Sequence, residues 1–109
     1  MNLSRPCLIG VVHLPPLIEN FGDTPFFAGR VPAETVAAMS RAAVAVREAV
    51  GAEMPVGFNV LRNDASSALG LCAACGGAFL RVNVHTGAMV TDQGVIEGKA
   101  AETLRLREA

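Results

Sequence analysis

The sequence predicts an α/β domain built on a parallel sheet, and three observations support this prediction. Short, continuous apolar runs are typical of strands that are buried on both faces. Longer segments between the runs have apolar residues at helical spacing. Strands that alternate with helices along a chain form right-handed βαβ units and therefore a parallel sheet. The runs Cys7–His13, Pro55–Asn59 and Phe79–Val84 are accordingly expected to be adjacent parallel strands with helices on one side.

The link after the first run is too short for this topology. Pro15 and Pro16 end that run, and Ile18–Asp23 is expected to be the end of a second strand passing into a turn. Only five residues separate His13 from Glu19, whereas a parallel crossover needs about a dozen or more. We therefore expect a segment to be missing here, with the second strand displaced, shortened or lost.

Two helices are predicted between the later strands. The first begins at Pro32, which suits a first helical turn, and runs to about Val50 before Gly51. Its apolar stripe consists of Val36, Met39, Ala43, Val46 and Val50. The second covers Ala65–Cys75, with Asp64 as its N-cap and Leu69, Cys72 and Gly76 on its inner face.

The rest of the chain is expected to be loop and helix. Residues Thr24 to Arg30 and His85 to Gly94 are predicted to be loops, and a last helix is expected to begin near Ile96. We see no linker or repeat, so residues 1–109 are predicted to form one domain. A complete eight-stranded barrel needs about 250 residues, so a barrel of this length would be incomplete.

Composition excludes some classes of function. Apolar residues make up 51% of the chain and the formal charge is −1 without a Lys/Arg cluster, so no nucleic-acid partner is expected. The apolar run near the N-terminus is too short to span a bilayer. Three cysteines with apolar neighbours and no secretion signal predict reduced thiols in a cytoplasmic protein.

Polar residues follow the predicted strands, where a parallel barrel has its active site. His13, Glu19 and His85 are candidate catalytic residues because each can act as a general acid or base. No metal site is predicted, since two His and one Glu have no diagnostic spacing, and no cofactor is indicated. The candidate ligand-binding residues are Asn20, Asn59, Arg62, Asn83 and Thr86.

Structural roles compete with these assignments. Asp64 is expected to be a helix cap, Asn20 and Asn63 suit turns, and Arg62 suits a pair with a loop carboxylate. For Arg81, a structural ion pair and a ligand contact are equally compatible with its position among apolar neighbours. A ligand role is slightly favoured for Asn59 and Asn83, because an unpaired buried amide costs about 1–3 kcal/mol. The alternative is that they bond each other or a neighbouring loop. Cys72 and Cys75 are expected to be buried, unbridged core residues, since they lie late in a helix rather than at its N-terminus.

Several long segments resemble one protein family. Residues 9–17 (IGVVHLPPL), 19–26 (ENFGDTPF), 56–64 (VGFNVLRND), 81–94 (RVNVHTGAMVTDQG) and 97–107 are similar to successive strands, loops and a helix of the BtpA/SgcQ family. The resemblance covers nearly the whole chain.

The resemblance implies a (β/α) barrel of the TIM type, grouped with ribulose-phosphate-binding barrels. Members of the family have a helix and most of a strand between the segments that are joined here at Leu17-Ile18, and they continue for about another half barrel. The chain is therefore expected to be roughly the first half of a barrel with an internal deletion, and self-association is expected. The family name implies a photosystem I biogenesis factor with protein partners, located peripherally at a membrane. Other members suggest an enzyme acting on a phosphosugar or nucleoside as its small-molecule ligand. A non-functional fragment is the third alternative.

Overall fold

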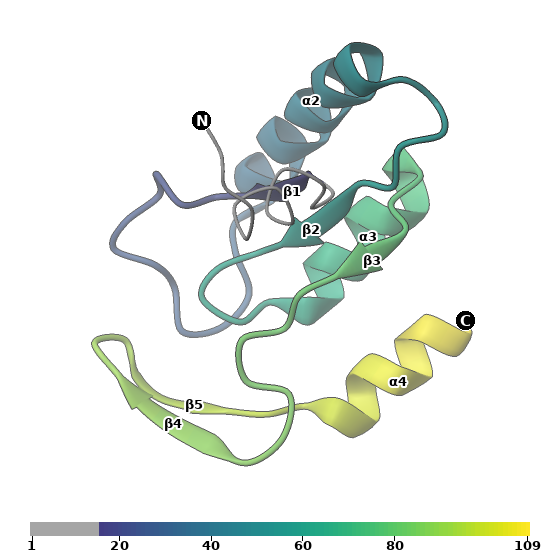
Figure 1. Cartoon of the computed structure of the whole chain (residues 1–109). Helices are drawn as coiled ribbons and strands as arrows, with labels where there is room; N and C mark the ends of the chain where they lie inside the picture. The colour runs from purple at the N-terminus through teal and green to yellow at the C-terminus, as the bar shows by residue number, and fades with distance from the viewer. Residues whose placement is uncertain (1–15) are drawn as a thin grey trace, which may run out of the picture.

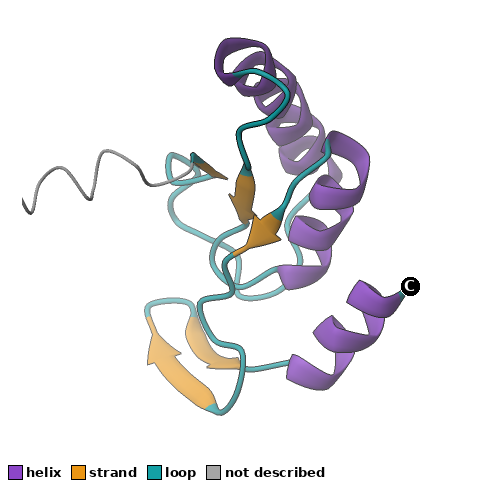
Figure 2. Cartoon of the chain, turned by 45° about the vertical axis from the view of Figure 1, so that its right-hand side comes forward, coloured by secondary structure: helices purple, strands orange, loops and turns teal. Residues whose placement is uncertain are grey.

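The computed structural model describes residues 16–109 and shows part of a (β/α) barrel (Figure 1). A small parallel sheet has helices on one face, and a hairpin and a last helix lie below it in Figures 1 and 2. The elements are β1 (Leu17–Glu19), α2 (Ala33–Val50), β2 (Gly57–Asn59), α3 (Ala65–Cys75), β3 (Phe79–Leu80), β4 (Ala88–Thr91), β5 (Gly94–Glu97) and α4 (Ala100–Glu108).

The sheet has the order β1-β2-β3, and both pairings are parallel. Leu17 pairs with Gly57, and Gly57 pairs with Phe79. This confirms the predicted parallel pairing of the strands near residues 57 and 79. The short second strand is kept as β1, and the predicted strand Cys7–His13 lies outside the described residues.

Helix α2 agrees with the prediction from the sequence. Pro32 precedes it, and Gly51 ends it with a φ of 88°, a conformation that favours glycine. Met39 and Ala43 are the buried members of the predicted stripe. The three valines of that stripe are partly buried against the same core.

Helix α3 also has the predicted bounds, but its inner face differs from the prediction. The buried residues are Ala68 and Leu71, whereas Leu69 is half-buried and Gly76 is exposed. Gly76 adopts a left-handed conformation that ends the helix. Cys72 of the predicted face does pack against the core. The centre of the face differs because Asp64 and the closing glycine fix only the helix ends, while packing on the sheet decides the rotation of the helix.

The core lies between the sheet and the two helices α2 and α3. Phe58, Leu71 and Val60 are its largest fully buried apolar side chains. Burying a side chain of this size contributes about 1.5–3 kcal/mol. Because successive side chains of a strand point to opposite faces, the residues on either side of Phe58 along β2 face away from the helices, toward the interior side of a barrel.

The C-terminal third departs from the prediction. The expected strand Phe79–Val84 ends at Leu80, and the expected loop His85–Gly94 contains β4, which pairs antiparallel with β5. The last helix begins at Ala100 rather than near Ile96, which is a buried residue of β5. Val95 and Ile96 are β-branched and favour a strand once a partner strand is present.

The turn of this hairpin has local causes. Gly94 has a φ of 101°, which favours glycine. The Thr91 hydroxyl donates to the Gly94 carbonyl at 2.9 Å and accepts from the Gln93 amide at 3.2 Å. At the base of the hairpin, the Gly98 amide donates to the Gly87 carbonyl at 2.7 Å.

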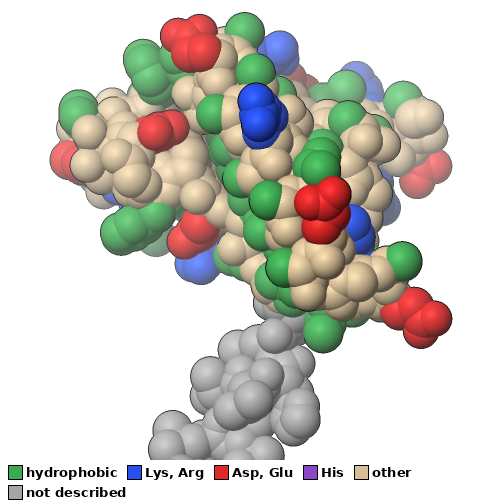
Figure 3. Space-filling view, turned by 90° about the horizontal axis from the view of Figure 1, so that it is seen from above, with side chains coloured by type: hydrophobic (Ala, Val, Ile, Leu, Met, Phe, Trp, Pro, Cys, Tyr) green, Lys and Arg blue, Asp and Glu red, His purple; other side chains and the backbone are tan. Residues whose placement is uncertain are grey.

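The surface is mixed in character. On the face seen in Figure 3, acidic and basic side chains are scattered among apolar ones. Within residues 16–109, no helix has the length and apolar character that crossing a membrane requires.

Candidate functional site

The C-terminal ends of the parallel strands form an open hollow of about 370 Å³. The side chains of β1 and β2 that alternate with the buried Ile18 and Phe58 point to the interior side of the sheet. At the C-terminal ends of these strands they are Glu19 and Asn59, which are paired in the register. Loop residues complete the wall. The lining residues are Glu19, Phe21, Thr24, Phe26, Asn59, Leu61, Arg62, Arg81 and Asn83.

Two of the predicted residues form a direct contact in this hollow. The Asn59 amide donates to the Glu19 carboxylate at 3.0 Å. Asn59 is only 2% exposed, whereas Glu19 is exposed. The contact holds the carboxylate in place, and its remaining lone pairs can accept hydrogen bonds from a ligand.

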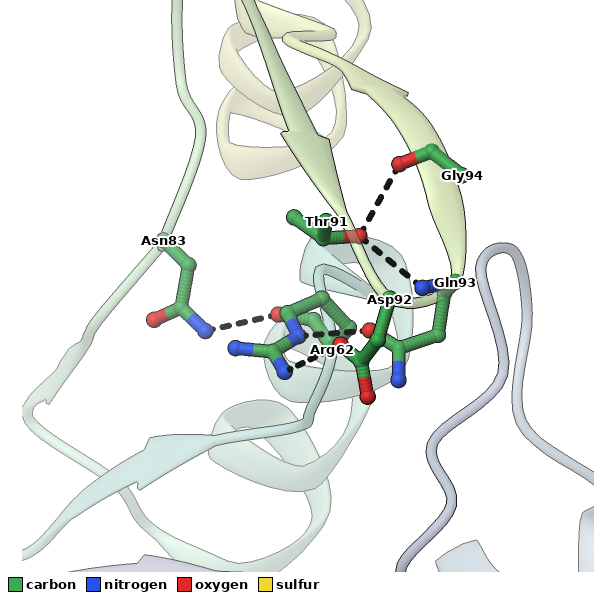
Figure 4. Close-up of polar contacts among 6 residues, drawn as sticks. All are labelled: Arg62, Asn83, Thr91, Asp92, Gln93 and Gly94. Carbon is green, nitrogen blue, oxygen red and sulfur yellow. Dashed lines mark hydrogen bonds and ion pairs between the residues drawn. The ribbon is translucent and has the colours of Figure 1, made fainter.

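Arg62 joins two loops beside the hollow. Its Nε donates to the Gln93 side chain at 2.9 Å, and its Nη2 forms an ion pair with Asp92 at 3.2 Å (Figure 4). The guanidinium also lies over the Phe26 ring, 5.1 Å from the centroid, which is a cation–π distance. The predicted pairing of Arg62 with a loop carboxylate is thus present, and its partner lies in the hairpin turn.

Asn20 and Asn63 have structural partners. Asn20 bonds both backbone groups of Leu61, donating to its carbonyl at 3.1 Å and accepting from its amide at 2.7 Å. Asn63 holds Val84 in the same way, at 2.9 and 2.7 Å. These contacts fix the loops at the strand ends, and Asn20 is absent from the lining of the hollow.

Asn83 lines the hollow and has one unused polar atom. Its amide nitrogen donates to the Arg62 carbonyl at 2.7 Å. Its Oδ1 is buried and has no hydrogen-bond partner among residues 16–109. Figure 4 shows this oxygen turned away from Arg62.

The remaining candidates lie elsewhere. His85 lines a different hollow of about 610 Å³, which also includes Cys72 and Thr103. Thr86 is exposed near the hairpin base and does not line the strand-end hollow. His13 lies outside the described residues. The structure therefore brings Glu19, Asn59, Arg62 and Asn83 together and leaves His85 and Thr86 apart from them.

Asp64 is a helix cap, as predicted. Its carboxylate accepts from the Ser67 amide at 3.1 Å and from the Val31 amide at 2.8 Å. Burial raises the pKa of Asp64, but hydrogen bonds from Ser67, Val31 and Ser66 together outweigh burial and lower it below 3.8.

Cys72 and Cys75 are free thiols and are half-buried rather than fully buried. Burial raises the pKa of Cys72, and the neighbouring Cys75 adds to this effect. A raised pKa disfavours the reactive thiolate. Both residues pack against the core cluster.

The sequence analysis missed the aromatic part of the hollow and left open whether Arg81 forms an ion pair or a ligand contact. Phe21 and Phe26 come from the loop after β1, and their rings lie 6.4 Å apart. Arg81 follows β3 by one position, so strict alternation from Phe79 places it on the interior side. That alternation was the available signal.

Comparison with known proteins identifies one family. The model of the BtpA family matches residues 17–109. The chain is 52% identical to the "Photosystem I biogenesis protein BtpA" of Synechocystis sp., over 84% of this chain and 31% of that protein. It is 45% identical to an uncharacterised protein of Methanocaldococcus jannaschii, over 84% of this chain and 34% of that protein. No solved structure matches the chain.

Another relative is aligned over more positions than this chain supplies residues. An uncharacterised protein of Pyrococcus furiosus is 38% identical over 94% of this chain and 50% of its own length. That alignment has 135 positions, although 94% of 109 residues is about 102 residues. About 33 positions of the relative therefore face a gap in this chain. The family model begins at Leu17, next to the junction where the crossover is too short.

Proposed function

Because the chain belongs to the BtpA family, whose members are TIM-type barrels, we propose that it carries a small-molecule site at the C-terminal ends of its strands. The observation that supports this most directly is the contact between Asn59 and Glu19 at the floor of the strand-end hollow. The proposed activity is that of a barrel enzyme acting on a small polar metabolite, the class to which phosphosugars and nucleosides belong. The chain spans about a third to a half of the length of its relatives, so the complete reaction is proposed for the longer proteins.

The structural roles of other amides strengthen this proposal. Asn20 and Asn63 hold backbone groups, so their presence is explained by the fold. Within residues 16–109, the Asn59 side chain bonds no backbone group, and its partner Glu19 is exposed to the hollow. A buried amide that supports an exposed carboxylate has no evident role in folding but suits ligand binding.

A role in assembly is the second candidate. The observation that favours it is the 52% identity to a protein named for photosystem I biogenesis. In that case the chain would act through protein partners at a membrane surface. A gene neighbourhood of photosynthesis genes would favour this role, whereas sugar-transport genes would favour the metabolite site. Because this chain lacks about 33 positions of its relative, a non-functional fragment is the third candidate.

A thermal-shift screen tests the metabolite site. The chain and the longer Pyrococcus furiosus relative are screened against a collection of phosphosugars, nucleosides and related metabolites. We expect at least one compound to raise the melting temperature of both proteins. Glu19→Gln should remove the shift in this chain. The matched control is Glu53→Gln, because Glu53 is exposed in the loop that precedes β2, at the other end of the strands.

Two results would contradict the proposal. The first is the absence of any stabilising compound for either protein. The second is a shift that Glu19→Gln and Asn59→Leu leave unchanged, since binding would then lie outside the strand-end hollow. Circular dichroism of each variant establishes that the fold is retained.

A further inference from the structure

The strand-end hollow contains one positively charged side chain, Arg81, that has no partner in the described part of the chain. Arg81 lies next to Asn59 in the extended register of β2 and β3, and its backbone amide continues the ladder by donating to the Phe58 carbonyl at 2.9 Å. Its side chain is exposed and lines the hollow. Among residues 16–109, its guanidinium has no hydrogen bond and no ion pair.

The other charged groups of the hollow do not neutralise Arg81. Arg62 is occupied by Asp92 and Gln93. Glu19 lines the same hollow, yet its hydrogen bond in the described structure is with Asn59 rather than with Arg81. A free guanidinium fork suits a carboxylate or phosphate, which it binds through two parallel hydrogen bonds.

A second polar atom in the wall needs a donor. Asn83 Oδ1 is buried without a partner in the described part of the chain, and the bond from its nitrogen to the Arg62 carbonyl fixes it as an acceptor. The free lone pairs of the Glu19 carboxylate are also acceptors. A ligand that fits the hollow therefore needs an anionic group and at least one hydroxyl or amine donor.

We propose that the hollow binds a small hydroxylated anion, with its carboxylate or phosphate on Arg81 and its hydroxyl groups on Glu19 and Asn83. This inference rests on the proposed metabolite site and adds the charge of its ligand. It separates anionic metabolites from neutral ones such as nucleosides. An open hollow of about 370 Å³ has the size of a small metabolite site.

Chemical-shift perturbation in NMR titrations tests this inference with five probes. Glycerol 3-phosphate and D-glycerate are anions with hydroxyl groups, glycerol has hydroxyl groups alone, and inorganic phosphate and acetate are anions without them. We expect the two hydroxylated anions to bind at least tenfold more tightly than the other three probes. The tighter of these two identifies phosphate or carboxylate as the preferred group.

Variants assign the charge to Arg81. Arg81→Gln should weaken both hydroxylated anions at least tenfold, and Arg81→Lys should restore part of the affinity because the charge returns without the fork. The matched control is Arg41→Gln, on the exposed face of α2, which should change nothing. Circular dichroism verifies the fold of each variant.

The results separate this inference from the proposed function. If glycerol binds as tightly as the anions and Glu19→Gln abolishes its binding, the metabolite site stands and the anion inference is wrong. If Arg81→Gln and Arg41→Gln weaken the anions equally, the effect is one of net charge and the inference is also wrong. If no probe binds and the metabolite screen is also negative, both proposals fail.

Discussion

Replacement of Asp64 by alanine should destabilise the fold more than any other single loss of a polar side chain in the described structure. Asp64 is 6% exposed and accepts four hydrogen bonds from three residues. Two of these come from the backbone amides of Val31 and Ser67. The carboxylate thus caps α3 and also ties the segment before α2 to it.

The magnitude follows from these contacts. Loss of an N-cap costs about 0.5–2 kcal/mol. The amide of Val31, a residue 6% exposed, would lose its acceptor, which costs about 1–3 kcal/mol. Because the two effects overlap, we expect Asp64→Ala to lower the free energy of unfolding by about 2–4 kcal/mol. Asp64→Asn should lower the free energy of unfolding by an intermediate amount. The nitrogen that replaces one carboxylate oxygen is a donor and would face another donor.

Urea unfolding followed by far-ultraviolet circular dichroism measures this change. The chain has no Trp or Tyr, so the helical signal is the suitable probe. The control is Asp23→Ala, since Asp23 is exposed and such substitutions usually change stability by no more than about 0.5 kcal/mol. Equal midpoints for Asp64→Ala and Asp23→Ala would refute the assigned role of Asp64.

The same carboxylate predicts a pH dependence. The pKa of Asp64 is lower in the folded chain than its ordinary value of 3.8, so its contribution is fully present above about pH 4. The contribution is lost as the pH falls through the folded pKa, because the unfolded state then binds the proton more readily. The stability difference between wild type and Asp64→Asn should therefore be constant near neutral pH and shrink below about pH 4. A constant difference across the acid range would contradict this sign.

Three further predictions concern separate parts of the fold. Arg47→Met should lower stability by about 1–3 kcal/mol in urea unfolding, because its guanidinium bonds the carbonyl ends of both α2 and α3; Arg41→Met, on the exposed face, should not. Gly57→Ala should lower the melting temperature through an overpacking cost of about 1–3 kcal/mol, since a Cβ there would meet the aromatic ring of Phe79, whereas a Cβ at Gly29 meets nothing. Cys72 should react with a thiol reagent more slowly in the folded chain than in urea, because burial raises its pKa, and equal rates would count against that burial.

Local signals in the sequence were sufficient for the two helices and for the parallel pairing of β2 with β3. Pro32 and Gly51 mark the ends of α2, and Asp64 and Gly76 mark those of α3. Such caps act within a few residues, so they can be recognised without tertiary information. Apolar continuity likewise predicted the parallel pairing of β2 with β3.

The position of His85 depended on a tertiary contact. A strand through Val84 would have placed Asn83 and His85 on the same face as Arg81, because alternate residues share a face. The strand ends instead at Leu80, and Asn63 holds the backbone of Val84 through two hydrogen bonds. Nothing local in the sequence indicates this contact between residues 21 positions apart.

The hairpin was also missed because it depends on contacts between residues that are not adjacent in sequence. Without the hairpin, the partners of Arg62 could not be identified. Residues 88–97 have a mixed pattern, and the pairing of Val90 with Val95 becomes evident only once the turn at Gly94 is known. Asp92 and Gln93 lie in that turn. A loop prediction therefore allowed a carboxylate partner for Arg62 but could not identify which one.

The last prediction is that the 109-residue chain, prepared alone, associates with itself. A closed barrel has no free strand edges, whereas β3 has no strand on its outer side in the described structure. A free edge offers unpaired backbone groups to other chains. The hairpin adds exposed apolar surface, since Val90 is 85% exposed and its cross-strand partner Val95 is 61% exposed.

Light scattering over a range of protein concentrations measures this association. We expect a mass above the 11.3 kDa of one chain, increasing with concentration. The double variant Val90→Thr/Val95→Thr keeps two residues that favour strands but removes apolar surface. If the hairpin drives association, the variant is monomeric; if the sheet edge does, the variant still associates, because the edge of β3 is unchanged. A wild-type monomer at all concentrations, with cooperative unfolding and the stability of an ordinary domain at about 5–15 kcal/mol, would show that neither the edge of β3 nor the hairpin causes self-association.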